Sequence, residues 1–374
     1  MIRQSSSTVI RLADIINEYE QDFIEKYKQF LLPGHFKALK AIKLCRSEAS
    51  PIMRLQCENE ACAHHVYLPH SCGHRHCPHC QNHETEQWIQ KQLQKQVPAE
   101  YFMITFTLPA QFRMLVWFNQ RLLYSILFQC VWDTLKSFAL NDKKLGGTPG
   151  AIAVLHTQSR ALNFHPHIHI VMPAATIDGT KRLWAEKGGK YLFCHKALAR
   201  VFRAKMLHAL SCHGLNLPHA YPEDWVADCK HVGKGNKALV YLGQYLYRGV
   251  IKEKDILSCR DGKVTFRYKN SKMNAGNSRS TNKYQTRTVS AVHFLWLVMQ
   301  HVLPRGFRRA RNFGFLHPNS KKMIRIIQWM FRLNVQKRTA KPRIKMKCPC
   351  CGHAMRVVDV LLPAGFRLPI PKPA

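Results

Sequence analysis

Acidic side chains are scarce in this sequence of 374 residues. It has 22 Asp and Glu against 57 Lys and Arg, which gives a formal net charge of +35 and a pI near 10.0. Solubility requires a far smaller charge, so the imbalance indicates a polyanionic partner, and nucleic acid is the first candidate. Between residues 301 and 374, Asp359 is the single acid among many basic residues. We expect this region to bind DNA, with Arg308, Arg309 and Arg311 among its contacts.

Long hydrophobic runs are missing as well. No apolar stretch reaches the roughly 18 to 20 residues that cross a bilayer, and the polar start MIRQSSSTVIRLAD lacks the apolar segment of a signal peptide. We therefore expect a soluble, intracellular protein. Internal repeats are also absent, and a hydrophobic content of 46% is typical of folded domains rather than of disordered chains.

Apolar periodicity predicts a mixture of helices and strands. The spacing of apolar residues from Leu12 to Phe30 predicts a helix that continues until Pro33 and Gly34. Further along the chain, we expect strands at 101–107, 151–156, 163–172 and 264–268, and helices at 112–139, 196–210 and 237–247. This mixture predicts an α+β fold.

Cysteine and histidine crowd the segment CENEACAHHVYLPHSCGHRHCPHC, which runs from residue 57 to residue 80. In a reducing compartment, such pairs indicate metal ligands rather than disulfides. We expect Cys57, Cys62, Cys77 and Cys80 to hold a structural Zn²⁺ in a small ribbon, whose folding free energy the metal supplies. The ligand set stays open, because the spare donors are Cys72, His64, His65, His74, His76 and His79. The alternative is a loop of free thiols.

A second, shorter cysteine motif lies near the C-terminus. The segment CPCCGH contains Cys348, Cys350 and Cys351, with His353 beside them. It has half of the ligands that a zinc ribbon needs. It either binds zinc with donors from elsewhere or forms a simple turn.

The segment NFHPHIHIV, residues 163–171, places histidine at alternate positions. On a strand, His165, His167 and His169 share one face, whereas Ile168 and Ile170 point to the other. Converging imidazoles predict a divalent-metal site, and two of them leave coordination positions open for a phosphate oxygen. We assign His167 and His169 to Mg²⁺ or Mn²⁺ with an unidentified third ligand. His165 is left out, because the proline that follows restricts its backbone.

Two tyrosines follow in KALVYLGQYLYR, residues 237–248. If this segment is helical, Tyr241 and Tyr245 lie one turn apart on the same face. Tyrosine on a helix is usually a packing or surface residue, so the histidine strand carries the argument for a catalytic role. A phenol beside a metal-bound phosphodiester can attack phosphorus and conserve the bond energy as a phosphotyrosine.

Five motifs together resemble one family: CPHCQ, FTLPAQFR, HPHIHI, YLGQYLYR and HVLPRGFRRARNFGFL. They are similar to those of the bacterial rolling-circle transposases of insertion-sequence family 91, which are two-tyrosine HUH endonucleases with an N-terminal zinc-binding domain. The likeness covers residues 54–355. The HUH motif, histidine–hydrophobic–histidine, matches His167, Ile168 and His169, and the two-tyrosine motif matches Tyr241 and Tyr245. The spacing of Cys57 and Cys62 departs from the CxxC that is common in the family.

The resemblance implies both a fold and a reaction. The fold is an antiparallel RRM-like sheet with the metal pair on a central strand and the catalytic tyrosine on a facing helix. The reaction is nicking and rejoining of single-stranded DNA at the element ends and the target through a 5′-phosphotyrosine. The resemblance also implies a location in the bacterial cytoplasm, in association with the nucleoid. The expected regions are N-terminal helices (1–50), a zinc-binding domain (51–95), an HUH domain (96–300) and a basic DNA-binding region (301–374).

Three other functions remain open at this point. A plasmid-type rolling-circle replication initiator shares the same chemistry. A non-enzymatic zinc-ribbon DNA-binding protein predicts metal-independent binding without a covalent adduct. A metal-dependent nuclease that activates water predicts cleaved DNA with no protein attached. The recognised DNA sequences and the oligomeric state do not follow from the sequence.

Overall fold

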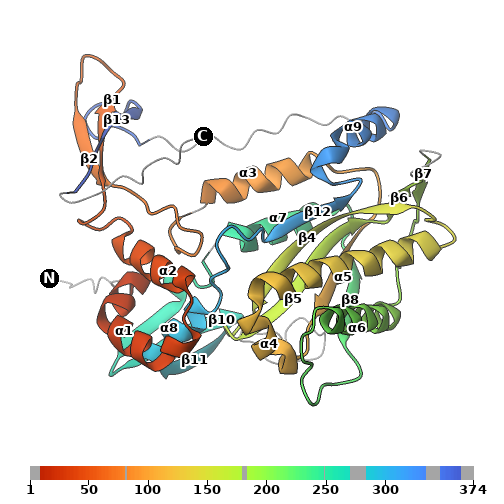
Figure 1. Ribbon diagram of the computed structural model, residues 1–374. Coiled ribbons are helices and arrows are strands. Elements are labelled where there is room, and N and C mark those ends of the chain that lie inside the picture. Colours follow the sequence, from red (N-terminus) through yellow and green to blue (C-terminus); the bar gives the residue numbers. More distant parts are fainter. Residues whose placement is uncertain are drawn as a thin grey trace, which may run out of the picture.

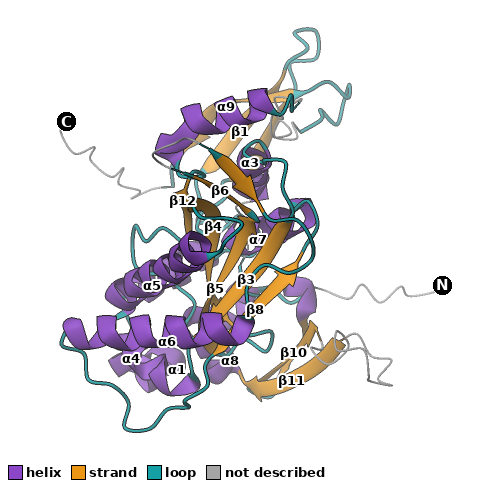
Figure 2. Ribbon diagram, turned by 90° about the vertical axis from the view of Figure 1, so that its right-hand side faces the viewer, coloured by secondary structure: helices purple, strands orange, loops and turns teal. Residues whose placement is uncertain are grey.

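The structure is a computed structural model that describes residues 9–80, 82–178, 183–247, 249–269, 284–333 and 346–363. Helices and antiparallel strands are mixed along the chain (Figures 1 and 2), which confirms the α+β class. Within these ranges, no helix is both long enough and apolar enough to cross a membrane.

The main sheet has the expected RRM-like connectivity. Its four central strands are β3 (Tyr101–Thr107), β4 (Thr148–Gln158), β5 (Phe164–Pro173) and β8 (Val226–His231). They lie in the order β4-β5-β3-β8, and every neighbouring pair is antiparallel. Helix α5 (Gln120–Asn141) connects β3 to β4, and α6 (His195–Cys212) precedes β8. This is the β-α-β-β-α-β order of a split βαβ fold.

Three short strands widen this sheet beside β4. Strands β6 (Ala175–Ile177) and β7 (Trp184–Glu186) continue it at one end, and β12 (Ala310–Gly314) pairs with β4. Gly314 has φ +57°, and a Cβ there would lie 1.7 Å from the carbonyl oxygen of Pro149, so only glycine fits. Because β12 belongs to the main sheet, the expected boundary at residue 300 is not a boundary of the fold.

Helices cover both faces of the sheet (Figure 1). Ile168 and Ile170 of β5 are fully buried in the core that α5 and α6 form on one face, as their alternation predicts. On the opposite face, α7 (Asn236–Tyr247) lies against β4 and β5, and α3 (Asn82–Leu93) packs on α7. A Cβ on Gly243 would lie 2.3 Å from a side-chain carbon of Ile89, so this glycine lets α3 and α7 pack closely.

A second core joins the N-terminal helices to a later part of the chain. It contains α1 (Leu12–Tyr27), α2 (Pro33–Leu44), α8 (Ala291–Met299) and the sheet of β9 (Ile256–Arg260), β10 (Lys263–Lys269) and β11 (Tyr284–Ser290). The first helix ends earlier than its periodicity predicts. A 3-10 turn follows it, and Pro33 begins α2, because proline is favoured in the first turn of a helix.

The long helix expected at 112–139 is divided in two. Helix α4 (Arg113–Phe118) and helix α5 meet at Asn119, whose φ of −125° and ψ of 34° are not helical. Asn119 also donates from its side chain to the carbonyl oxygen of Leu115, an interaction by which asparagine competes with the helical backbone. The break turns α4 away from α5 at the point where the sequence shows no glycine or proline.

The zinc-binding ribbon is built from both halves of the sequence. Strands β1 (Ile52–Cys57) and β2 (His65–Pro69) form a sheet with β13 (Met355–Leu361), in the order β13-β1-β2. Helix α9 (Lys321–Met330) follows β12 and lies between the main sheet and this ribbon along the chain. The expected zinc domain at 51–95 therefore lacks one of its three strands.

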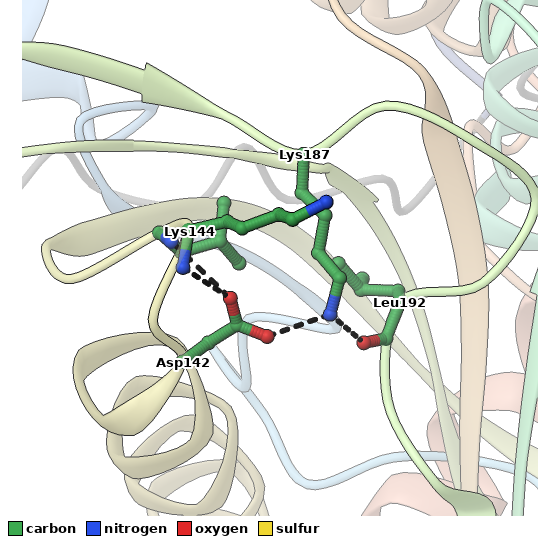
Figure 3. Close-up of polar contacts among 5 residues, drawn as sticks. Asp142, Lys144, Lys187 and Leu192 are labelled. Carbon is green, nitrogen blue, oxygen red and sulfur yellow. Dashed lines mark hydrogen bonds and ion pairs between the residues drawn. The ribbon is translucent and has the colours of Figure 1, made fainter.

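An ion pair fastens the end of α5 to the loop before α6 (Figure 3). Asp142 accepts a hydrogen bond from the Lys187 ammonium at 2.6 Å, and the same ammonium donates to the carbonyl oxygen of Leu192 at 2.8 Å. The other carboxylate oxygen accepts from the backbone N–H of Lys144 at 2.9 Å. Burial opposes ionisation, but Lys187 and the N–H groups prevail and lower the pKa of Asp142. The contact links the C-terminal end of α5 to the segment between β7 and α6.

Candidate active site and metal clusters

Three histidines meet on the face of the sheet that α7 covers. His167 and His169 are on β5, and His156 on β4 lies directly opposite His167 in the antiparallel register. The ring centroid of His156 is 5.3 Å from that of His167 and 4.4 Å from that of His169, and the last two are 4.9 Å apart. One ring nitrogen from each residue lies within 4.8 Å of the others. We call this group the histidine cluster.

The hydrogen bonds of the histidine cluster fit a metal site. The Nδ1 atom of His167 contacts the carbonyl oxygen of His165 at 2.6 Å, and Nδ1 of His169 contacts the hydroxyl of Thr105 at 2.9 Å. In each ring Nε2 is left for a metal, and such outer partners are typical of ligating histidines. The Nε2 atom of His156 is buried and makes no hydrogen bond to any described residue. A divalent ion would satisfy it and leave coordination positions open for substrate.

Electrostatics keep the three imidazoles neutral. Burial lowers the pKa of His167 to about 3 and that of His169 to about 4, and it lowers the pKa of His156 well below its usual value. The neighbouring histidines lower the pKa of His156 further, as does the buried Arg309. Neutral imidazoles have the free lone pair that a metal requires.

His156 is the candidate for the third ligand that the sequence left unidentified. A signal for it was present, because the strand expected at 151–156 ends on this histidine. Its pairing with residue 167 could not be predicted from the expected boundaries, because it requires the strand to continue past residue 156, as β4 does to Gln158. His165, which was left out of the ligand set, lies outside the cluster, and its Nδ1 is 3.4 Å from the guanidinium of Arg113.

The two tyrosines face the histidine cluster from α7. The ring of Tyr245 stacks on His156 at 4.5 Å, whereas the ring of Tyr241 lies edge-on to His169 at 5.9 Å. The two phenol rings are 4.8 Å apart, so the structure brings together both predicted nucleophiles and both predicted ligands. Burial raises the pKa of Tyr241, and the charge of Arg160 opposes this increase.

The three arginines expected to contact DNA have different surroundings. Arg308 is exposed, but Arg309 is only 6% exposed, and its Nε donates to the carbonyl oxygen of Leu155 at 2.8 Å. Arg311 lies over the ring of Phe128 at 4.4 Å and is half-buried. The expectation that Arg309 contacts DNA from the surface is therefore wrong. Its guanidinium instead binds the backbone of β4 at Leu155, next to His156. The Arg309 side chain lies in the core because the strand that follows it, β12, pairs with β4.

The four cysteines predicted to share one zinc ion belong to two clusters. Cluster 1 consists of Cys45, Cys72, Cys77 and Cys80, and cluster 2 consists of Cys57, Cys62, Cys348 and Cys351. The predicted grouping of all four in one site is wrong, because the β1–β2 hairpin separates its two pairs. Cys45, which follows α2, was not predicted as a ligand. The C-terminal cysteines Cys348 and Cys351 share cluster 2 with Cys57 and Cys62.

The sulfur atoms of both clusters have the spacing of a tetrahedral zinc site. In cluster 1, the Sγ atoms of Cys45 and Cys77 are 3.5 Å apart, and those of Cys72 and Cys80 are 3.7 Å apart. In cluster 2, the Cys57–Cys351 and Cys62–Cys348 distances are 3.4 and 3.8 Å. A tetrahedron with Zn–S bonds of about 2.3 Å requires roughly 3.8 Å between sulfurs, whereas a disulfide requires about 2.0 Å. Both clusters therefore fit Zn²⁺.

Zinc content tests the division into two clusters. We expect the natural chain to hold two Zn²⁺ ions, and the double substitution Cys348→Ser, Cys351→Ser to leave one, since cluster 2 would retain two thiolates. Cys350→Ser is the matched control, because this exposed cysteine lies between the two ligands but outside the cluster. Native mass spectrometry gives the count directly. Two tightly bound ions in the double variant would contradict the assignment.

Comparison with known proteins places this chain among transposases. A family model described as "Putative transposase" matches residues 150–323, and one described as "Transposase zinc-binding domain" matches residues 15–108. The chain is 30% identical over 329 residues to "Putative transposase y4qJ" of Sinorhizobium fredii, covering 82% of this chain and 80% of that protein. It is also 28% identical over 288 residues to "Transposase for insertion sequence element IS801" of Pseudomonas savastanoi pv. phaseolicola, covering 73% and 68%.

Proposed function

Since the chain belongs to the insertion-sequence 91 family of transposases, with an N-terminal zinc-binding domain, we propose that it nicks and rejoins single-stranded DNA through a tyrosine nucleophile. The observation that carries this proposal is the position of Tyr241 and Tyr245, whose rings lie over three histidines suited to one divalent ion. As a transposase, the protein is an enzyme that acts on DNA. The rolling-circle route, the single-stranded substrate and the catalytic metal belong to the proposal.

The reaction needs no energy source besides the DNA itself. The phenol oxygen of Tyr241 or Tyr245 attacks the scissile phosphorus, and the bond from phosphorus to the 3′ oxygen breaks. The products are a 5′-phosphotyrosine and a 3′-hydroxyl, which takes up the proton that the phenol loses. Reversal with a different 3′-hydroxyl joins the strand to a new end. The second tyrosine allows one chain to hold a second 5′ end.

The residues of the histidine cluster would hold Mg²⁺ or Mn²⁺. Such an ion would polarise the scissile phosphate and stabilise charge on the leaving oxygen. His156, His167 and His169 would hold the ion close to the rings of Tyr241 and Tyr245, and α3 holds α7 in place through the close packing at Gly243. Burial raises the pKa of Tyr241, so this phenol is protonated at neutral pH in the free protein.

Basic residues around the cluster supply contacts for the DNA backbone. The positive charge of Arg160 acts on the Tyr241 phenol, and Arg287 donates to the side chain of Asn163 at 2.8 Å, at the start of β5. Arg308 is exposed just before β12. Each phosphate that such a residue neutralises makes binding weaker as the salt concentration rises.

The test is a covalent trapping assay with the zinc-loaded protein. Labelled single-stranded DNA from the ends of the element is incubated with Mn²⁺ or without added divalent metal, and the products are separated on a denaturing gel. We expect an adduct that requires Mn²⁺ and that retains the label only when it is placed 3′ of the nick. Peptide mapping should locate it on Tyr241 or Tyr245. Cleaved DNA without attached protein would indicate a water-activating nuclease instead.

A further inference from the structure

A cavity of about 370 Å³ opens between the N-terminal helices and the start of β5, the strand that carries His167 and His169. Its walls come from α1, α4 and α8, together with the first residues of β5. Five of its eleven lining residues are aromatic: Tyr27, Phe30, Trp117, Phe164 and Trp296. We call this cavity the aromatic pocket. It lies outside the histidine cluster, and neither Tyr241 nor Tyr245 lines it.

The rings of the aromatic pocket are held in fixed orientations. Trp296 stacks on Tyr27 with centroids 4.7 Å apart and an angle of 6°, and the hydroxyl of Tyr27 is hydrogen-bonded to His293 at 3.0 Å. Trp117 meets Trp296 edge-on at 5.0 Å. Flat walls that are already ordered lose little entropy when a planar ligand stacks on them.

The polar groups of the pocket are few, and none is acidic. The Nε atom of Arg113 is buried and makes no hydrogen bond to a described residue, and the amide of Asn163 is exposed at the rim. The positive charges of Arg287 and Lys26 act on His293 in the wall. Aromatic walls with a few convergent donors and surrounding positive charge suit a planar ligand that has a polar edge and carries an anionic group.

The pocket is connected to the catalytic site by a short path of contacts. Arg113 reaches His165 at 3.4 Å, and the ring of His165 is 5.1 Å from that of His167. Along β5, Asn163 lies four residues before His167, or about 13 Å at 3.3 Å per residue. Stacked nucleotides advance about 3.4 Å each, so this distance corresponds to about four nucleotides, or fewer in an extended strand.

We propose that the aromatic pocket binds one unpaired base of the DNA strand that is nicked, while Arg113 contacts a neighbouring phosphate. This inference rests on the proposed function, and it adds a site that fixes which phosphate reaches the tyrosines. A base stacked on Trp296 holds the strand in register with the histidine cluster. The same pocket chemistry would accept a free nucleotide, so the test must distinguish binding of a DNA strand from binding of a mononucleotide.

The most informative substitution fills the pocket. Trp296→Ala would also remove packing against Tyr27 and Phe30, so its effect on binding could not be separated from misfolding. Met114 lines the cavity and is 53% exposed, so Met114→Trp adds a ring without removing any core contact. Leu140→Trp is the matched control, because Leu140 is 46% exposed on α5 and does not line the cavity.

Binding is measured by fluorescence anisotropy with labelled single-stranded DNA from the element ends, in which each nucleotide in turn is made abasic. All variants carry Tyr241→Phe and Tyr245→Phe, and no divalent metal is added, so the result does not depend on nicking. We expect one abasic position to weaken binding about tenfold, which is typical of one lost base–aromatic stack. Met114→Trp should weaken the intact strand by a similar factor and remove this position effect, whereas Leu140→Trp should preserve it.

Two results would overturn the proposal. One is equal binding of the intact strand by the two tryptophan variants. The other is that deoxynucleoside monophosphates compete for binding in a way that depends on Met114, while no abasic position weakens binding of the strand. The pocket would then bind a free nucleotide. Failure of the tyrosine chemistry gives a different pattern, in which the abasic effect persists but the unsubstituted protein forms no adduct.

Discussion

Replacing both Tyr241 and Tyr245 with phenylalanine is expected to reduce the covalent protein–DNA adduct by at least about 10³-fold, as loss of a nucleophile does in other covalent enzymes. Phenylalanine preserves the ring that stacks on His156 and the contact between the two aromatic rings. Affinity for single-stranded DNA should therefore change by less than about threefold, since no charge is removed. The measurement is adduct yield on a denaturing gel beside anisotropy on the same preparations.

The single variants show whether each of the two tyrosines can act as the nucleophile. Tyr245 lies flat on His156, whereas Tyr241 is 37% exposed and lies beside His169. If both are nucleophiles, each single variant should form an adduct on the remaining tyrosine. Tyr191→Phe is the control, because this tyrosine is 62% exposed and contacts Lys187 rather than the histidines. An adduct that survives in the double variant would refute the assignment.

His156→Ala is expected to slow nicking at least about 100-fold at limiting Mn²⁺, because the cluster would lose one of three ligands. This substitution is informative because the sequence motif names only His167 and His169. Mn²⁺ affinity, measured by electron paramagnetic resonance on zinc-loaded protein, should fall in parallel. His156→Asp supplies a carboxylate ligand in the same place and should recover part of the rate.

The control for His156 is His208→Ala, which removes an exposed histidine on α6. It should leave both the Mn²⁺ affinity and the nicking rate at their original values. A His156→Ala protein that is folded, keeps two zinc ions and shows an unchanged Mn²⁺ dependence would exclude His156 as a ligand. The metal would then be held by His167, His169 and a group from the substrate.

Much of the main sheet could be predicted because its signals are local. Alternation in β5 placed Ile168 and Ile170 in the core and the histidines on the opposite face, and the i, i+4 spacing placed Tyr241 and Tyr245 together. The order of the strands came from the family resemblance rather than from the pattern. The break at Asn119 was missed, because a side-chain hydrogen bond to the backbone leaves no periodic signal.

The parts that could not be predicted depend on distant pairings. Cys57 and Cys351 are 294 positions apart, and nothing in a ligand spacing indicates which half-site completes which. Arg309 belongs to the same class of error. Its position in a basic segment predicts that Arg309 is a surface residue, but the pairing of β12 with β4 buries it beside Leu155.

Cluster 2 also sets an order of events during translation. Cys57 and Cys62 leave the ribosome early, and at about 5 to 20 residues per second the 294 positions from Cys57 to Cys351 take about 15 to 60 s to synthesise. During this interval β1 has no β13 beside it, and its cysteines have half of their ligands. The buried core of the ribbon, Leu55, Cys57, Cys348 and Met355, is too small to fold without the metal. The ribbon therefore closes after synthesis of the catalytic sheet, and a chain that stops before Cys348 leaves it open.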